Sequence, residues 1–221
     1  MSVPKLIVML TYNDMTVKNA DEVFENCKKS SAQYFGFKEE PLEKEKMKEL
    51  FKYMKECGKT TVLEVVTYTE KECIEGAHLA KYCGCDILMG TMYSDYINEF
   101  CKKNNILYMP FIGKIEERPS ILKGEISDMI EEANYYNDMG TYGIDLLGYR
   151  YIDDAFKLNY ELVKNTKNNV CIAGSINSYK RLFEIKEINP WAFTIGSAFF
   201  ENKFEGTMEE QINKVYKYIR R

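Results

Sequence analysis

Two short stretches near the C-terminus carry most of the information in this sequence: Val170-Cys171-Ile172-Ala173-Gly174-Ser175-Ile176-Asn177 and Phe193-Thr194-Ile195-Gly196-Ser197-Ala198-Phe199. Each reads as a short apolar strand that runs into a glycine-serine pair, and a helical stretch separates the two. Glycine lets the backbone approach an anion closely, and the serine hydroxyl and the following N–H groups supply neutral donors. Two such turns in successive strand–helix units predict an anion site. The alternative is that both glycines simply end their strands.

Short apolar runs alternate with amphipathic stretches along the whole chain. The runs expected to form strands are Lys5–Leu10, Tyr34–Lys38, Thr61–Val66, Asp86–Gly90, Leu107–Ile112, Gly143–Leu147, Val170–Ala173 and Phe193–Ile195. The stretches expected to form helices are Ala20–Lys29, Glu43–Cys57, Glu70–Tyr82, Asp95–Lys103, Glu125–Asp138, Ala155–Lys164, Tyr179–Ile188 and Met208–Arg220. Strict alternation of this kind predicts a parallel sheet covered by helices.

About eight strand–helix units favour a closed barrel over an open, doubly wound sheet. An open sheet more usually shows GxGxxG in its first unit, and Thr11-Tyr12-Asn13-Asp14 stands there instead. No low-complexity or Pro/Gly-rich linker divides the chain. We therefore predict a single (β/α)8 barrel domain over residues 1–221. Anion turns on the last two strands of such barrels form a phosphate cup, so a phosphorylated small molecule is the expected ligand.

The composition is that of one globular domain with a substantial core. The chain has 221 residues, of which 45% are hydrophobic and 29% charged, with a formal net charge of −4. This balance favours neither nucleic acid nor an anionic membrane surface as a partner. No apolar run approaches the roughly 18 residues that span a bilayer, and the start lacks the layout of a signal peptide. We expect a cytoplasmic protein, and the sequence leaves a homodimer open.

The cysteines and the single histidine argue against several kinds of site. The seven cysteines form no CxxC pair, and Cys83-Gly84-Cys85 alone is weak support for a metal. His78 lies inside a predicted helix, far from the ends of the strands. A serine-hydrolase triad therefore lacks its base, and a histidine-based metal cluster is excluded. We expect no metal and no cofactor, with chemistry carried by lysine and carboxylates.

Charged residues occur within predicted strands, where a barrel is buried on both faces. Lys38, Glu64 and Asp145 are the three cases, and each carries a desolvation cost that needs a reason. We predict that all three point into the mouth of the barrel as catalytic residues, close enough to surround one substrate carbon. The alternative is structural, as a buried ion pair or as anchors for loop amides.

Further candidates lie just beyond the strands, at the rim that carries function in barrels. Asn13 and Arg150 are predicted to bind substrate, although Arg150 could equally be a surface residue. Asp14 suits the N-cap of the following helix as well as it suits a catalytic role. The predicted phosphate site comprises five residues of the two glycine-serine turns: Gly174, Ser175, Asn177, Gly196 and Ser197.

The pattern resembles the phosphate-binding (β/α)8 barrels that include ribulose-phosphate epimerase, the histidine- and tryptophan-pathway isomerases and N-acetylmannosamine-6-phosphate 2-epimerase. As architecture the resemblance covers the whole chain, and at motif level it rests on residues 172–177 and 195–198. Gly36-Phe37-Lys38 also looks like the strand of the N-acetylmannosamine-6-phosphate epimerases that carries a proton-transferring lysine. The chain departs from those epimerases where they carry a glutamate on the seventh strand, since Ala173 and Gly174 stand there.

Three functions follow from these residues. The first is an isomerase or epimerase of a phosphorylated sugar, in which Lys38 moves a proton next to a carbonyl with Glu64 or Asp145 as its partner. The second is an aldolase in which Lys38 forms a Schiff base. The third is a barrel without catalytic activity that binds a phosphorylated metabolite.

Overall fold

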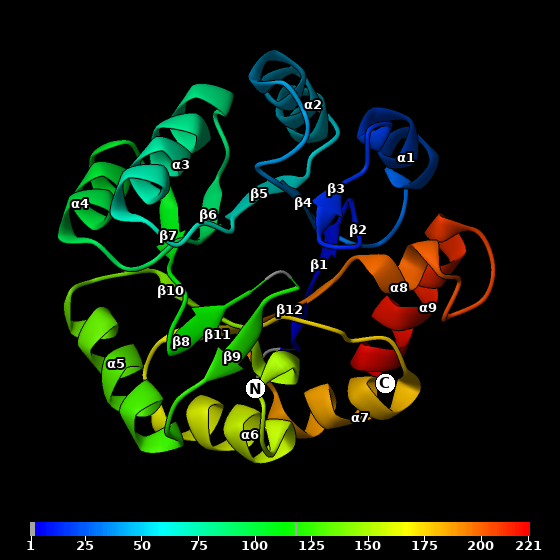
Figure 1. Cartoon of the computed structure of the whole chain (residues 1–221). Helices are drawn as coiled ribbons and strands as arrows, with labels where there is room; N and C mark the ends of the chain where they lie inside the picture. Colours follow the sequence, from blue (N-terminus) through cyan, green and yellow to red (C-terminus); the bar gives the residue numbers. More distant parts are fainter. Residues whose placement is uncertain (1–2, 118) are drawn as a thin grey trace.

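The computed structural model describes residues 3–117 and 119–221, and eight parallel strands surround a common axis in it (Figure 1). These strands are β1 (Lys5–Met9), β4 (Tyr34–Lys38), β5 (Thr60–Val65), β6 (Ile87–Gly90), β7 (Leu107–Met109), β10 (Gly143–Leu146), β11 (Asn169–Ile172) and β12 (Ala192–Ile195). They pair in the order β10-β11-β12-β1-β4-β5-β6-β7.

The two ends of this sheet meet and close the barrel. The amide of Tyr142 donates to the carbonyl of Tyr108 at 3.0 Å, and the amide of Asp145 donates to that of Pro110 at 2.8 Å. Phe111 and Asp145 form a parallel bridge at the same junction. The predicted (β/α)8 barrel is confirmed, because these contacts join the two ends of the eight-stranded parallel sheet.

Helices form an outer ring around the strands (Figure 1). They are α1 (Ala20–Cys27), α2 (Lys44–Glu56), α3 (Glu70–Cys83), α4 (Asp95–Lys103), α5 (Ile126–Asp138), α6 (Ala155–Asn165), α7 (Tyr179–Ile188), the short α8 (Ser197–Phe200) and α9 (Met208–Arg220). Local signals set their starts: Thr207 and Glu210 form a capping box at α9, and Ser178 accepts the amide of Arg181 at α7.

The barrel is filled in two layers of apolar packing. The larger core lies between strands and helices, where Phe37 stacks on Phe51 at 4.2 Å and Phe24 meets Phe35 edge to face at 5.2 Å. A smaller cluster fills the lumen with Ile7, Met9, Val62, Ile87, Met89, Met109, Cys171 and Ala192. Trp191 packs against this cluster from the ends where the strands begin. The lumen is therefore a packed core that can hold a site only where the strands end.

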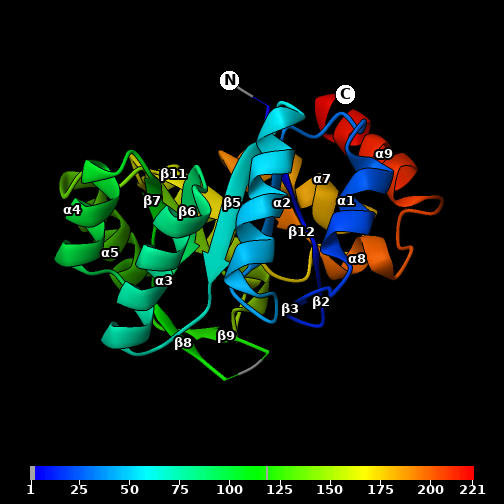
Figure 2. The same ribbon diagram turned by 90° about the horizontal axis from the view of Figure 1, so that it is seen from above.

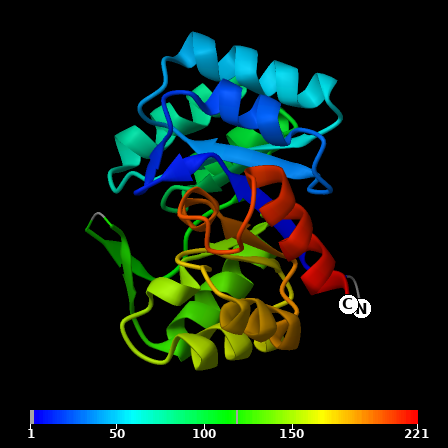
Figure 3. The same ribbon diagram turned by 90° about the vertical axis from the view of Figure 1, so that its right-hand side faces the viewer.

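Two hairpins and the short helix α8 were not predicted. One hairpin pairs β2 (Thr11–Tyr12) with β3 (Met15–Thr16), and the other pairs β8 (Lys114–Glu116) with β9 (Ile121–Lys123). Figure 2 and Figure 3 place both hairpins on the face of the barrel opposite the chain termini. They raise the wall of the barrel around the ends of the strands.

The predicted strands all form: β4 has the predicted ends, and the ends of the others shift by at most three residues. The largest shift is in β7, which ends at Met109 although the apolar run continues to Ile112. Pro110 follows Met109, and proline has no N–H to continue the strand ladder. The predicted helices likewise form where expected, and α4, α7 and α9 have the predicted ends.

Candidate functional site

A cavity of about 540 Å³ opens at the carboxyl ends of the strands. Its wall is formed by β1, β4, β5 and β12, by the turns after β10, β11 and β12, by the region of α8 and by both hairpins. The lining residues are Met9, Thr11, Asn13, Asp14, Lys38, Glu64, Pro119, Ser120, Ile121, Leu147, Arg150, Ala173, Gly174, Ser175, Ile176, Asn177, Thr194, Ile195, Gly196, Ser197, Ala198 and Glu201. The two predicted glycine-serine turns and most of the predicted charged residues thus share one cavity.

Lys38 and Glu64 stand side by side on one wall of this cavity. They are register partners on the neighbouring strands β4 and β5, so both side chains point to the same side of the sheet, and both line the cavity. Lys38 Nζ lies 3.8 Å from Glu64 Oε1 and 3.3 Å from Asp14 Oδ1. Both Lys38 and Glu64 are buried, so the ammonium group lies between two carboxylates at the edge of the cavity.

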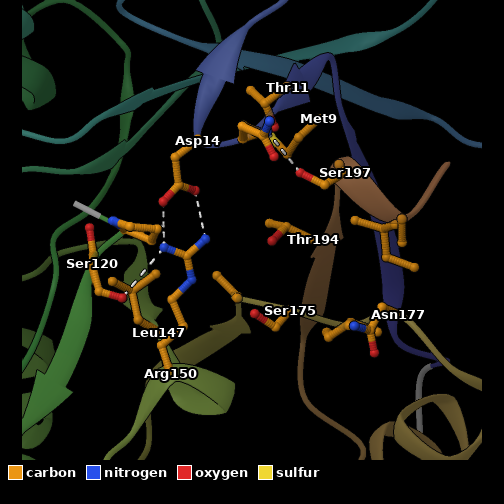
Figure 4. A pocket seen from close by; sticks show the side chains of 18 of the residues that line it. Met9, Thr11, Asp14, Ser120, Leu147, Arg150, Ser175, Asn177, Thr194 and Ser197 are labelled. Atoms are coloured by element: carbon orange, nitrogen blue, oxygen red, sulfur yellow. Dashed lines mark hydrogen bonds and ion pairs between the residues drawn. The ribbon is translucent and has the colours of Figure 1, made fainter. Parts of the chain in front are cut away.

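Asp14 and Arg150 form a bidentate salt bridge across the cavity (Figure 4). Arg150 Nη1 donates to Asp14 Oδ2 and Nη2 donates to Asp14 Oδ1, each at 2.6 Å. Arg150 Nη1 also reaches the carbonyl of Ser120, at 3.4 Å, in the turn between β8 and β9. Asp14 comes from the first hairpin and Arg150 from the 3-10 turn Gly148–Arg150, so the bridge ties opposite parts of the rim together.

Asp14 is part of this bridge and does not cap a helix. Helix α1 has Asn19 at its N-cap position, so the alternative assigned to Asp14 is wrong. Asn13 and Asp14 both have positive φ, at 49° and 63°, and form the turn of the β2–β3 hairpin. Burial alone raises the pKa of Asp14, but the hydrogen bond from Arg150 and the charge of Lys38 outweigh it and lower the pKa to about 2.

Asp145 lies deeper than predicted. It is fully buried and does not line the cavity. Its register partner is Cys171, and the residues two positions further along the two chain segments, Leu147 and Ala173, line the cavity instead. Complete burial and the charge of Glu64 raise the pKa of Asp145 well above its usual range. Neither of its oxygens has a hydrogen-bond partner among the described residues. Asp145 therefore lies beneath the cavity and not on its wall, and its catalytic role stays a prediction.

The two glycine-serine turns face the same cavity from the ends of β11 and β12. Gly174 and Ser175 both have positive φ, at 85° and 49°, which turns the backbone back toward the cavity. Ser197 is the first residue of α8, whose leading amides have no acceptor within the helix. The Ser197 hydroxyl accepts a hydrogen bond from the amide of Asn13 at 3.2 Å. Figure 4 shows Ser175, Asn177 and Ser197 on the side of the cavity away from Leu147.

Both glycines also have a packing reason. A Cβ on Gly196 would approach the Thr11 side chain and would lie 2.9 Å from the Thr11 carbonyl. A Cβ on Gly174 would lie 2.8 Å from Cγ of Arg150. Substitution of either glycine would therefore disturb the hairpin or the Asp14–Arg150 bridge as well as any bound anion.

Sequence reasoning missed the connection between Asp14 and Arg150, which are 136 residues apart in the chain. The adjacent Asn13-Asp14 pair was the available signal, because residues that tolerate positive φ favour a two-residue hairpin turn. The second hairpin was missed as well, although Tyr68 holds it through hydrogen bonds of 2.9 Å to the Glu117 carbonyl and the Ser120 hydroxyl. These contacts fix Ser120 at the cavity.

Within residues 3–117 and 119–221, no group of three or more histidine, cysteine and acidic side chains could hold a metal ion. All seven cysteines are free thiols, six of them buried. Over the same residues, no helix has both the length and the apolar character that a membrane crossing requires.

Comparison with known proteins identifies the fold. No family model matches the sequence, and no curated protein matches it. Among solved structures, N-acetylmannosamine-6-phosphate 2-epimerase from Clostridium perfringens is similar with a TM-score of 0.66 and 15% identity, over 97% of this chain and 93% of the other. Phosphoribosylanthranilate isomerase from Thermotoga maritima gives 0.62 and 15%, over 98% of both chains.

Orotidine 5'-phosphate decarboxylase from Lactobacillus acidophilus gives a TM-score of 0.68 at 10% identity, over the whole of both chains. All three proteins carry a phosphorylated compound in their names. Identities this low establish architecture and leave activity open. The chain has the (β/α)8-barrel fold that it shares with these three structures.

Proposed function

We propose that this protein is an isomerase or epimerase that acts on a phosphorylated sugar or sugar-like metabolite by proton transfer next to a carbonyl. One observation carries the proposal: a single cavity has Lys38 between two carboxylates on one wall and the turns of Ser175 and Ser197 on another. Barrels of the same fold named for an epimerase and an isomerase of phosphorylated compounds support it.

The phosphate would be held by backbone amides and hydroxyls of the two turns. The amides of Ser197 and Ala198 and those around Gly174–Asn177 would select a tetrahedral anion by geometry. Anchoring the phosphate there would leave the carbon skeleton to reach toward Lys38, which turns binding energy into orientation.

Lys38 would first release the proton of its ammonium group to solvent, and the free amine would then remove the proton next to the carbonyl and return it. The carboxylates of Asp14 and Glu64, 3.3 and 3.8 Å from Nζ, would stabilise the ammonium group that forms. Glu64 is the better proton partner of the two acids first considered, because it lines the cavity and Asp145 does not. No step of this reaction calls for a cofactor.

The phosphate site is tested by adding one negative charge at Ser197. Ser197→Asp should weaken binding of glucose 6-phosphate at least about tenfold, roughly 1.4 kcal/mol, by repulsion, whereas Ser197→Asn should stay within about threefold. Both replacements can accept the hydrogen bond from the amide of Asn13. Isothermal titration calorimetry with each variant makes the comparison. Equal affinities for the two variants would place the phosphate elsewhere.

The role of Lys38 is tested by proton exchange. Lys38→Met should lower exchange of solvent deuterium into a panel of ketose and aldose phosphates by at least about 10³-fold while phosphate affinity stays within about fivefold. Nuclear magnetic resonance measures the exchange, and Lys114→Met, on the exposed β8–β9 hairpin, is the control. An adduct on Lys38 trapped by borohydride would instead support the aldolase. Phosphate binding with no exchange in the wild type would support a binding protein.

A further inference from the structure

The cavity has no cation left over for a second anionic group on the substrate. Among its described lining residues, the cations are Lys38 and Arg150 and the carboxylates are Asp14, Glu64 and Glu201. Arg181 contacts the Ser175 carbonyl but is not among the residues that line the cavity. A phosphate held by neutral amides at the glycine-serine turns uses neither cation. Whether either cation can pair with a second anionic group therefore decides which groups the rest of the substrate can carry.

Arg150 is paired with Asp14, and its Nη1 also contacts the carbonyl of Ser120. Both of its terminal nitrogens contact the two oxygens of that carboxylate at 2.6 Å, which is the two-point geometry that a substrate carboxylate would otherwise occupy. Its side chain also packs closely over Gly174, where a Cβ would lie 2.8 Å from Cγ of Arg150. The Arg150 side chain is thus fixed by Asp14 at its guanidinium group and by Gly174 along its aliphatic part.

Lys38 is committed in the same way. Its ammonium group lies within ion-pair distance of Asp14 and of Glu64, and 10% of its side chain is exposed. A carboxylate brought into this cavity would have to displace Asp14 or stand unpaired beside it. Either outcome has a large cost in a partly buried site, because an unpaired charge there loses its hydration.

We infer that the substrate is a monophosphate whose other groups are uncharged, and that Asp14 is the residue that excludes carboxylate-bearing phosphates. The inference rests on the proposed phosphate site and adds the substrate class. Exclusion by a charge that the wrong ligand cannot pair is an ordinary route to specificity. Uncharged hydroxyl and carbonyl groups can instead share hydrogen bonds with Asp14, Glu64 and Arg150 without displacing any of them.

Matched ligand pairs test the inference. Each pair joins an aldehyde to the acid of the same length: glucose 6-phosphate with 6-phosphogluconate, ribose 5-phosphate with 5-phosphoribonate, and glyceraldehyde 3-phosphate with 3-phosphoglycerate. In the wild-type protein, calorimetry should find the aldehyde member bound at least about tenfold more tightly in the pairs that bind. Asp14→Asn should free Arg150 and tighten binding of the acid about tenfold or more. The ratio of the aldehyde's affinity to the acid's affinity should therefore fall toward one or reverse. Asparagine suits the positive φ of 63° at this turn.

Two further variants separate this cause from a general loss of negative charge. Adding Arg150→Gln to Asp14→Asn should abolish the gained affinity for the acid. Glu201→Gln removes a cavity carboxylate whose partner is Lys203 at 3.4 Å, so it should change the ratio less than about threefold.

The outcomes are distinct. Acids that bind the wild type as tightly as the aldehydes overturn the inference and leave the phosphate site standing. The same holds if Asp14→Asn, folded by circular dichroism, leaves the ratio unchanged. Failure of all six ligands and of inorganic phosphate to bind overturns the proposed phosphate site, and this inference with it.

Discussion

Asp14 is the residue on which the electrostatics of the cavity turn. Its carboxylate contacts both cations of the described cavity wall, and its pKa is lowered to about 2 although burial acts in the opposite direction. A carboxylate with a lowered pKa stays ionised far below neutral pH. The bridge to Arg150 therefore persists over the whole range in which an enzyme of this kind would work.

Acid unfolding should report this bridge. Because the pKa of Asp14 is lower in the folded chain than its usual 3.8, its contribution to stability is present above about pH 4 and is lost as the pH falls toward 2. That contribution is at most about 2 kcal/mol, since the side chain is partly exposed. Urea unfolding at pH 5 and pH 2 should show a smaller acid loss in Asp14→Asn than in the wild type.

Glu116→Gln is the matched control for this measurement. The pKa of Glu116 is also lowered to about 2, by hydrogen bonds from Lys114 and Lys123, but the group lies on the exposed hairpin. Added salt should therefore erase its contribution while leaving most of that of Asp14. An Asp14→Asn protein that loses as much stability in acid as the wild type would contradict the assignment.

At the scale of elements, the site depends on strand β4, which carries Lys38 into the mouth. Gly36, two residues earlier on the same face, lies against β5, where an added Cβ would be 2.5 Å from the carbonyl oxygen of Val62 and 2.8 Å from its Cβ. Glycine lets the two strands approach at this level of the lumen. The register between Lys38 and Glu64, and hence their contact, depends on that approach.

Gly36→Ala should therefore lower the free energy of unfolding by about 1–3 kcal/mol through overpacking of the lumen. Denaturant titration measures the loss. Gly58→Ala is the comparison, because Gly58 has open space around it and a φ of 75°, so its cost of about 1 kcal/mol reflects backbone conformation alone. A Gly36→Ala protein as stable as the wild type would show that the strands can move apart.

At the scale of the whole molecule, barrel closure makes one cavity from distant parts of the chain. Closure between β7 and β10 removes both edges of the sheet, and every strand delivers its end to the same face. That geometry brings the hairpin of Asp14 beside the turn of Arg150. The expectations of a single domain over residues 1–221, of a homodimer and of a cytoplasmic location remain predictions.

The sequence by itself determined the barrel, the order of its elements and the candidate turns. Apolar periodicity and glycine positions are local signals, and a parallel sheet with crossover helices has few ways to arrange eight such units. The lumen positions of Lys38 and Glu64 were predictable for the same reason, since a charge within a doubly covered strand has few places to go.

Only the tertiary structure decided the pairing of Asp14 with Arg150 and the depth of Asp145. The pairing depends on a contact between segments that are 136 residues apart in the chain. The depth of Asp145 depends on the register of its strand against the neighbouring strand. Neither leaves a local pattern in the sequence. The hairpins that bring Asp14 and Ser120 to the cavity are likewise set by loop geometry and by contacts across the rim. The physical reason is that these contacts join residues far apart in the sequence, which come together only when the chain folds.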